Sequence, residues 1–273
     1  MATPTATGYA PVNGLELYWE RFCDADAAGS ATPLILVHGG YGSIGLLDGV
    51  ITAFSAHRPV IAIELQGHGH TRDTDRPFSY EAWGDDIGAL APSLGLASVD
   101  VLGYSLGAGA TLRAAIQHPD VVRRLVVVSF PFRRDGWFPE VRAGFDTMDR
   151  ALFEVLQHSP MYAAYQQIAP DVAAFPTLID KTGELHRRPF DWADDVRGLT
   201  VPTLLVFADA DSIPAAHIAD FYALLDGGLR DSMLAQPPRS ASQLAVMPNR
   251  THYDVIDAPG LIDAVEAFLG GSD

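Results

Sequence analysis

One serine, one aspartate and one histidine have the residue types and the chain order that acyl-transfer chemistry needs. Ser105 is the centre of Gly103-Tyr104-Ser105-Leu106-Gly107, a G-x-S-x-G pattern, and Asp211 and His252 come later in the chain. A histidine can take the proton of a serine hydroxyl, which then attacks a carbonyl carbon, while an aspartate orients the imidazole. We therefore predict that Ser105 is a nucleophile, His252 its general base and Asp211 the acid that fixes the imidazole.

The elements around these three residues would bring them to one edge of a sheet. Three apolar runs predict strands that end before them: Val99–Gly103, Thr203–Ala208 and Gln243–Met247. A helix is predicted over Leu106–Gln117, and a short loop, Pro248-Asn249-Arg250-Thr251, separates the third strand from His252. The carboxyl ends of parallel strands meet at one edge, where ligands bind in α/β sheets. Asp209 is the rival acid, but it lies nearer to its strand, where its side chain has less reach.

A second glycine pattern suggests different chemistry. Gly40-Tyr41-Gly42-Ser43-Ile44-Gly45 is a G-x-G-x-x-G, and Glu64 lies 19 residues beyond it, where a dinucleotide site would place its ribose-binding acid. An NAD(P)-dependent reductase is therefore an alternative. The dinucleotide fold usually opens with its glycine-bearing strand, whereas a hairpin precedes it here, and a tight glycine turn, Gly67-His68-Gly69, follows Glu64. Because of these features, a reductase is a much weaker candidate than an enzyme with a serine nucleophile.

The glycines of this second pattern have a use that needs no cofactor. Backbone N–H groups must bind the oxyanion that forms when a serine attacks a carbonyl. Leu106, directly after the nucleophile, supplies one N–H at the start of a helix. We expect the second from the turn Gly39–Tyr41, with Gly40 ahead of Tyr41.

The rest of the chain alternates short apolar runs with helical patterns. Asn13-Gly14 predicts a hairpin turn between strands Gly8–Val12 and Leu15–Phe22. Further strands are predicted at Leu34–Val37, Val60–Ile63 and Leu125–Ser129, and helices at Gly45–Ser55, behind an N-cap at Ser79, from Pro214 and at Pro259–Leu269. This alternation predicts a mostly parallel sheet with helices on both faces. The polar stretch Gly227–Ser242 is predicted to be a surface loop.

Residues 131–197 interrupt the alternation. They contain no convincing strand and ten of the 26 aromatic residues, and apolar side chains recur at helical spacing in Val141, Phe145, Met148, Leu152 and Val155. Because the segment begins at a strand end, we interpret it as a helical cap inserted into a core domain of residues 1–130 and 198–273. An ordinary helical subdomain with its own small core is the alternative. The candidate walls of a substrate pocket are aromatic: Tyr41, Phe130, Trp137, Phe138, Tyr162 and Tyr165.

Together these motifs resemble the α/β-hydrolase superfamily, and the resemblance covers essentially the whole chain. The matching pieces are His38-Gly39-Gly40, Gly67-His68-Gly69, the serine turn, Ala208-Asp209-Ala210-Asp211 and Thr251-His252. The resemblance implies an eight-stranded, mostly parallel sheet with a variable cap, and a triad of Ser105, Asp211 and His252. Many relatives carry glycine where this chain has Ala208, a mild departure.

Composition excludes several classes of partner. The chain has 273 residues and a formal net charge of −16, which repels nucleic acid and anionic membrane surfaces. The single cysteine, Cys23, forms no internal disulfide, and the N-terminus does not have the pattern of a signal peptide, so we expect a cytoplasmic protein. His68, His70, Asp73 and Asp75 lack the spacing of a metal site. We expect no metal and no organic cofactor, and we expect His38 and His68 to hold turns through hydrogen bonds.

These observations predict a serine hydrolase of carboxylesterase type. Its substrate would be a small, fairly apolar carboxylic ester or lactone, cleaved through an acyl-enzyme intermediate. The same triad could instead hydrolyse a C–C bond in a diketone or transfer the acyl group to an acceptor other than water. A ligand receptor on the same fold is the alternative from another class. The sequence leaves the oligomeric state open.

Overall fold

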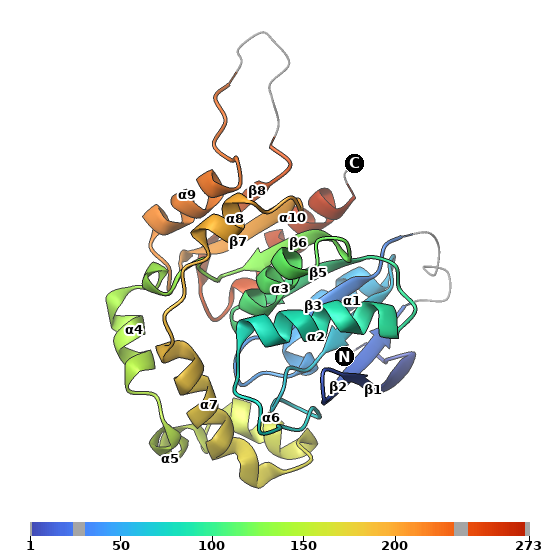
Figure 1. Ribbon diagram of the computed structural model, residues 1–273, viewed down its shortest axis with the longest axis vertical. Coiled ribbons are helices and arrows are strands. Elements are labelled where there is room, and N and C mark those ends of the chain that lie inside the picture. Colours follow the sequence, from blue (N-terminus) through green and yellow to red (C-terminus); the bar gives the residue numbers. More distant parts are fainter. Residues whose placement is uncertain (1, 24–30, 232–239, 271–273) are drawn as a thin grey trace.

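The computed structural model describes residues 2–23, 31–231 and 240–270. In these residues eight strands form one sheet in the order β1-β2-β4-β3-β5-β6-β7-β8 (Figure 1). The strands are β1 (Ala6–Val12), β2 (Leu15–Phe22), β3 (Leu34–Val37), β4 (Val60–Ile63), β5 (Val99–Tyr104), β6 (Val122–Val128), β7 (Thr203–Ala210) and β8 (Gln243–Thr251). The β1–β2 and β2–β4 pairs are antiparallel and the others are parallel, which confirms the predicted mostly parallel sheet.

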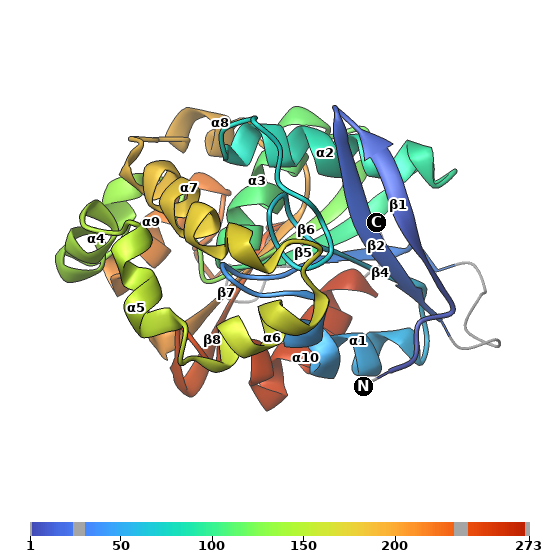
Figure 2. The same cartoon turned by 90° about the horizontal axis from the view of Figure 1, so that it is seen from below.

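Helices cover both faces of this sheet. The α-helices of the described part are α1 (Asp48–Ser55), α2 (Tyr80–Ser93), α3 (Leu106–Gln117), α4 (Pro139–Asp146), α5 (Phe153–Leu156), α6 (Pro160–Ile168), α7 (Phe175–Arg187), α8 (Ala193–Arg197), α9 (Ala215–Leu224) and α10 (Pro259–Leu269). The 3₁₀-helices are η1 (Ile44–Leu47), η2 (Arg134–Gly136), η3 (Arg150–Leu152), η4 (Val172–Ala174) and η5 (Val255–Asp257). Figure 2 shows α2 and α3 on one side of the sheet and α1 and α10 on the other. The apolar side chains accordingly form two buried clusters, one on each face.

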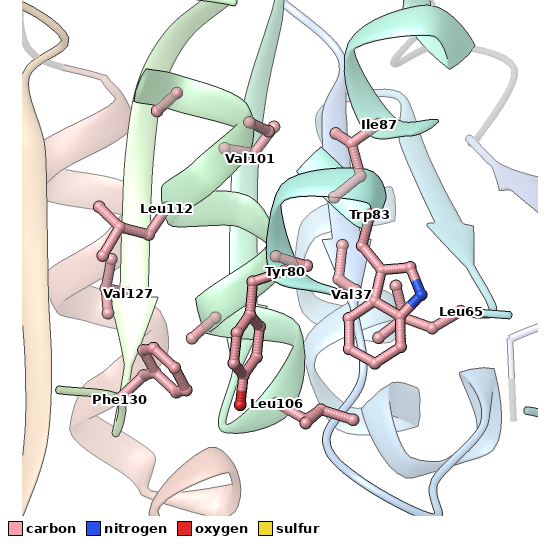
Figure 3. Packing of buried hydrophobic residues seen from close by; sticks show 14 of the residues in the cluster. Val37, Leu65, Tyr80, Trp83, Ile87, Val101, Leu106, Leu112, Val127 and Phe130 are labelled. Carbon is pink, nitrogen blue, oxygen red and sulfur yellow. The ribbon is translucent and has the colours of Figure 1, made fainter. Parts of the chain in front are cut away.

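Two of the central strands, β3 and β4, are short and buried on both faces. All four residues of β3 and all four of β4 are buried and aliphatic, the pattern expected inside a parallel sheet. Figure 3 shows Val37 of β3 and Val101 of β5 facing Trp83 and Ile87 of α2. Burying side chains of this size contributes roughly 1.5–3 kcal/mol each.

Strand register brings several loops to one level. Val37 pairs with Ile63 on one side and with Gly103 on the other. His38 and Glu64, the residues that follow β3 and β4, therefore leave the sheet beside Tyr104, the last residue of β5, at the carboxyl edge. The loops that should carry chemistry begin here.

Helix starts follow the predicted signals. The Ser79 hydroxyl accepts a hydrogen bond of 3.2 Å from the N–H of Ala82, which confirms the N-cap of α2. Pro214 was expected inside the next helix, but it is the N-cap residue, and α9 begins at Ala215. The predicted helix Gly45–Ser55 is divided into η1 and α1.

The last two strands differ most from prediction. β8 continues to Thr251 instead of ending at Met247, so the predicted loop before His252 is wrong. The carboxylate of Asp209 accepts hydrogen bonds from the N–H groups of Asn249 and Arg250, at 2.9 and 3.1 Å, and holds this stretch beside β7. The pairing resumes at Ala210 and Thr251 beyond an irregularity. The Asp209 side chain thus takes the place of backbone hydrogen bonds between β7 and β8 at this point. Sequence periodicity cannot predict such a contact.

Residues 131–197, all of them described, form helices and one isolated bridge, between Arg133 and Asp191. The residues that recur at helical spacing, from Val141 to Val155, are divided among α4, the stretch after it, η3 and α5. The chain breaks after α4 and restarts at η3, where the Asp149 carboxylate accepts from the N–H of Ala151. Val155, the last residue of that pattern, is 68% exposed. We call residues 131–197 the helical insertion.

The helical insertion lies over the carboxyl edge of the sheet. The Lys181 ammonium of α7 pairs with Asp73 at 2.6 Å, and the Arg188 guanidinium donates to the carbonyl of Phe78 at 2.9 Å. Asp73 and Phe78 belong to the loop that follows β4. Figure 1 shows α4, α5 and α7 gathered beyond this edge. Of the predicted loop Gly227–Ser242, residues 232–239 lie outside the described part, and the residues on either side are neither helix nor strand.

Candidate active site

Ser105 lies on a sharp turn between β5 and α3. Its backbone has φ 52° and ψ −119°, a conformation that costs roughly 1–3 kcal/mol for a residue with a side chain. A Cβ atom at Gly107 would lie 2.3 Å from the carbonyl oxygen of His38, and one at Gly103 would lie 2.4 Å from that of Gly107. Only glycine fits at these two positions, so the G-x-S-x-G pattern is what allows the turn to form.

The three residues predicted from the sequence are in contact. The Oγ atom of Ser105 lies 2.9 Å from Nε2 of His252, and Nδ1 of His252 lies 3.1 Å from Oδ1 of Asp211. His252 and Asp211 are buried, with 8% and 9% of their surfaces exposed. Because the carboxylate can only accept, Nδ1 carries the proton and Nε2 is left to accept from the serine hydroxyl. This arrangement can remove a proton from Ser105 when the hydroxyl attacks an electrophile.

His252 is held in place by two aromatic neighbours. The hydroxyl of Tyr104, the residue before the nucleophile, donates a hydrogen bond of 2.7 Å to the carbonyl of His252. The ring of Trp137, from the helical insertion, lies edge-on to the imidazole with centroids 5.6 Å apart. Tyr104 was not singled out from the sequence, although its place beside Ser105 was a signal.

The carboxylate of Asp211 accepts three further hydrogen bonds. The hydroxyl of Ser129 donates to Oδ2 at 2.5 Å, and the N–H groups of Ala208 and Ser212 donate at 3.0 and 2.7 Å. Donors of this kind stabilise the charged form of an acid and fix its orientation. Ser129 follows β6 directly and has φ 55°. Sequence analysis missed its role, although its place at a predicted strand end was available as a signal.

Asp209 does not reach the histidine. Its carboxylate lies in the exposed end of β7, where the N–H groups of Asn249 and Arg250 lower its pKa. Of the two acids considered from the sequence, Asp211 alone contacts His252.

Leu106 and Gly40, whose N–H groups are the predicted oxyanion donors, lie close to each other at the serine turn. Leu106 is the first residue of α3, so its N–H has no acceptor within the helix. A Cβ at Gly39 would lie 3.4 Å from Cβ of Ser105, and one at Gly40 would lie 3.9 Å from Cβ of Leu106. The turn is closed by a hydrogen bond of 3.1 Å from the N–H of Gly42 to the carbonyl of Gly39. The loop after β3 and the serine turn therefore pack directly against each other.

His38 and His68 hold backbone groups, as predicted. Nε2 of His38 accepts from the N–H of Leu65 at 3.2 Å, and Nδ1 lies 2.7 Å from the carbonyl of Gly39. Nδ1 of His68 lies 3.1 Å from the carbonyl of Gln66. Burial lowers the pKa of both rings, that of His68 to about 3. Both side chains are therefore neutral supports of the loops at the sheet edge.

Glu64, the acid of the alternative dinucleotide pattern, is fully engaged by its own loops. One carboxylate oxygen accepts from the N–H of Ile44 at 3.2 Å. The other accepts from the N–H of His70 at 2.6 Å and contacts its ring at 2.9 Å. With 1% of its surface exposed, this carboxylate holds the loop after β3 against the loop after β4 and is not free for a ribose.

The aromatic pocket candidates are divided among different environments. Trp137 faces His252, whereas Phe130 is completely buried and packs among Tyr80, Phe190 and Trp192. The Tyr162 ring packs against Phe153 and Phe175, and Phe138 is 36% exposed.

Tyr41 and Tyr165 line a cavity of about 400 Å³ between the loop after β3 and α6. The Tyr41 side chain also reaches the helical insertion, where its hydroxyl donates to Sδ of Met148 at 3.2 Å.

The described residues contain no group of three or more His, Cys, Asp or Glu side chains that could hold a metal ion. Of the four residues weighed as a metal cluster, His70 contacts Glu64, and Asp73 pairs with Lys181. In the same part of the chain, no helix has both the length and the apolar character needed to cross a membrane.

Known proteins are similar to this chain in part of the sequence and in the overall fold. Ethanol acetyltransferase 1 of Cyberlindnera jadinii is 34% identical over 98 residues, which are 35% of this chain and 29% of that protein. The sn-1-specific diacylglycerol lipase ABHD11 of Mus musculus is 36% identical over 110 residues, 38% of this chain and 34% of that protein. The chain thus spans about a third of the length of these curated relatives.

A solved structure matches over nearly the full length. The crystal structure of an alpha/beta hydrolase enzyme from a Medee basin deep-sea metagenome library has a TM-score of 0.74 and 17% identity, covering 97% of this chain and 98% of that chain. Residues 32–249 match the family model described as alpha/beta hydrolase fold. The match includes β3 to β7, the serine turn and Asp211, so most of the chain is covered. The chain belongs to the alpha/beta hydrolase fold family.

Proposed function

We propose that the protein is a serine hydrolase that cleaves a small, fairly apolar carboxylic ester or lactone through an acyl-enzyme. The observation that carries the proposal is the chain of contacts from Ser105 Oγ through the imidazole of His252 to the Asp211 carboxylate, at 2.9 and 3.1 Å. Neighbouring residues in turn orient His252 and Asp211, two of these three residues. A serine that served only as a helix cap would need no such base, and the Ser105 side chain makes no capping hydrogen bond.

In the first half of the reaction, Oγ of Ser105 attacks the ester carbonyl carbon while Nε2 of His252 takes the hydroxyl proton. The negative charge that forms on the carbonyl oxygen faces the N–H groups of Leu106 and Gly40. Such donors contribute about 3 kcal/mol each in related chemistry. The imidazolium then gives its proton to the leaving alcohol, the C–O bond breaks, and the acyl group remains on Ser105.

In the second half, His252 takes a proton from water, and the resulting hydroxide attacks the acyl carbon. The tetrahedral intermediate collapses, Ser105 recovers its proton from the imidazolium, and the carboxylic acid leaves. Asp211 stays ionised throughout and stabilises each imidazolium. The hydrogen bonds from Ser129, Ala208 and Ser212 hold the carboxylate in position.

The surroundings favour a neutral, apolar substrate. The helical insertion presents aromatic side chains to the sheet edge, with Trp137 against His252. The net charge of −16 disfavours anionic substrates. We further propose that residues 131–197 act as a cap over a core of residues 1–130 and 198–273.

Acyl transfer to an alcohol is a second candidate function. It is favoured by the ethanol acetyltransferases of yeasts among the relatives, to which about a third of the chain is similar. The acyl-enzyme is common to both reactions, and an alcohol would take the place of water in the second half. Adding ethanol during turnover of an ester separates the two, because a transferase converts a large share of the acyl groups to the ethyl ester.

The proposal is tested by the Ser105→Ala variant with 4-nitrophenyl acetate and butyrate. We expect kcat to fall by a factor of about 10⁴ or more, since the residual rate comes only from binding and the oxyanion donors. Turnover equal to that of the wild type would reject the proposal. An unchanged thermal unfolding midpoint in the variant shows that the lower kcat comes from the missing hydroxyl and not from unfolding.

A further inference from the structure

An apolar groove lies between the loop after β3 and helix α6. It has a volume of about 400 Å³. We call it the α6 groove, and its lining residues are Tyr41, Gly42, Ser43, Gly45, Leu46, Asp48, Gly69, Pro160, Met161, Ala164, Tyr165 and Ile168. Figure 2 shows α6 close to the start of α1, and both elements contribute residues to the lining.

The lining has the composition of a site for a hydrocarbon. Apolar side chains line both walls. Leu46 on one wall and Met161 on the other are each 41% exposed. The polar side chains besides those of the two tyrosines are Ser43 and Asp48, and no lysine, arginine or histidine belongs to the lining. A concave, mostly apolar lining with few polar groups is typical of a small-molecule site.

The α6 groove begins beside the proposed oxyanion hole. Tyr41 lines the groove, and the residue before it, Gly40, packs against Leu106. The side chain of Tyr41 is fixed by its hydrogen bond to Met148 and by Phe175, whose ring centroid lies 5.9 Å away. Tyr41 is therefore the residue through which the groove adjoins the proposed site.

A second cavity of about 250 Å³ adjoins the groove and shares Ser43, Gly45, Asp48, Ala164 and Ile168 with it. Its lining includes the apolar side chains of Phe22, Ile44 and Ile51 as well as Glu20, Glu64 and His70. Carboxylates therefore lie near this end of the groove, and they repel carboxylate, phosphate and sulfate groups.

We propose that the α6 groove binds an unbranched alkyl chain of a neutral ester substrate, which rests on the serine hydrolase function proposed above. A methylene group takes roughly 30 Å³, about the share of one water molecule in the liquid. The groove therefore has room for a chain of roughly ten carbons. The walls select for length, since each further methylene leaves water until the groove is filled.

The test measures kcat/KM for two series of neutral esters. One series is 4-nitrophenyl esters of acids from acetate to dodecanoate, and the other is acetates of alcohols from ethanol to dodecanol. We expect kcat/KM to rise about fourfold per methylene in the series whose chain enters the groove, and to level off at about ten carbons. The other series stays flat, so the comparison also shows whether the acyl or the alcohol side is bound.

Two variants of the same helix form a matched pair. Ala164 lines the groove, whereas its neighbour Ala163 is exposed and belongs to neither cavity. Ala164→Trp fills the groove, so we expect it to lose the preference for long chains over acetate by at least tenfold. Ala163→Trp should keep the profile of the wild type. Met161→Glu, a change at a partly exposed position, provides a second variant with the same expectation if Ala164→Trp unfolds.

The outcomes separate this proposal from the one on which it rests. A chain-length profile that Ala164→Trp and Met161→Glu leave unchanged overturns the groove proposal, while ester turnover that requires Ser105 keeps the hydrolase function. A loss of dimers in Ala164→Trp on size exclusion, with an unchanged profile, would make the groove an interface between copies of this chain and would also overturn it. Absence of any Ser105-dependent turnover contradicts the proposed function itself.

Discussion

The hydroxyl of Ser129 donates a hydrogen bond of 2.5 Å to Oδ2 of Asp211, and so connects the end of β6 to the end of β7. The other oxygen of the same carboxylate contacts His252 at 3.1 Å. Asp211 is therefore held from both sides. The orientation of the imidazole depends on a residue that belongs to none of the three positions predicted from the sequence.

Removing this hydroxyl should slow the reaction without preventing substrate binding. A hydrogen bond to a charged group contributes about 1.5–3 kcal/mol. If this is realised in the transition state, Ser129→Ala lowers kcat roughly tenfold to hundredfold with little change in KM. Ser212→Ala is the matched control, because Ser212 donates to Asp211 through its backbone N–H, which the variant keeps. Equal kinetics for the two variants would show that Ser129 does not position the acid.

The two aspartates after β7 should differ sharply in their effect. Asp211→Asn removes the charge that stabilises the imidazolium, and we expect kcat to fall by a factor of about 10⁴, as for the buried acid of other triads. Asp209→Asn should leave kcat within about threefold of the wild type, because the Asp209 carboxylate binds the N–H groups of Asn249 and Arg250 and does not contact His252. Steady-state kinetics with one ester checks both. A larger loss of kcat in Asp209→Asn than in Asp211→Asn would show that Asp209, and not Asp211, is the acid that acts on His252.

The glycine after Leu106 should be essential to the fold of the serine turn. A methyl group at Gly107 would lie 2.3 Å from the His38 carbonyl oxygen, and backbone cannot move aside cheaply. We expect Gly107→Ala to lower the free energy of unfolding by about 3 kcal/mol or more. Gly49→Ala is the control: this glycine lies in α1 with nothing within 4 Å, so alanine should stabilise the protein by about 0.5–1 kcal/mol. Urea denaturation of both variants measures the difference, and a stable Gly107→Ala would contradict the packing described.

Buried histidines should make the protein sensitive to acid. Both ring nitrogens of His217 are buried and have no hydrogen-bond partner among the residues that the structure describes, and burial lowers its pKa to about 4. Between pH 6.5, near the ordinary pKa of histidine, and pH 4, the unfolded chain binds a proton that the folded chain does not. The free energy of unfolding therefore falls as the pH falls through this window.

Replacing His217 by an apolar side chain tests this sign. His217→Leu removes one proton from the difference between the two states, so unfolding free energy should fall less steeply between pH 6.5 and 4 than in the wild type. Stability at pH 7 should not decrease, because no hydrogen bond is lost. The same substitution at the exposed His158 should leave the slope as in the wild type. An unchanged slope in His217→Leu would mean that this ring is charged in the folded protein.

The fold was predictable where burial on both faces leaves only one pattern. The runs Leu34–Val37 and Val60–Ile63 have the bounds in the structure that apolar periodicity predicts. The contact of Ser105, Asp211 and His252 was foreseeable because parallel strands bring their carboxyl ends to one edge, so that chain order and strand ends suffice.

Features that depend on side chains bonding to backbone were not predictable. The extension of β8 depends on the Asp209 carboxylate, which replaces ladder bonds at Asn249 and Arg250. The role of Ser129 depends on the register between β6 and β7, which no pattern within either strand specifies. The break after α4 depends on a local cap at Asp149 that competes with helical periodicity.

The central claim is that the hydroxyl of Ser105 is the nucleophile. The most direct measurement is labelling of the folded protein with a fluorophosphonate, followed by mass spectrometry of its peptides. The account predicts one adduct, on the peptide that contains Ser105, which disappears in Ser105→Ala and is strongly slowed in Asp211→Asn. An adduct on another residue, or labelling that persists in Ser105→Ala, would contradict it.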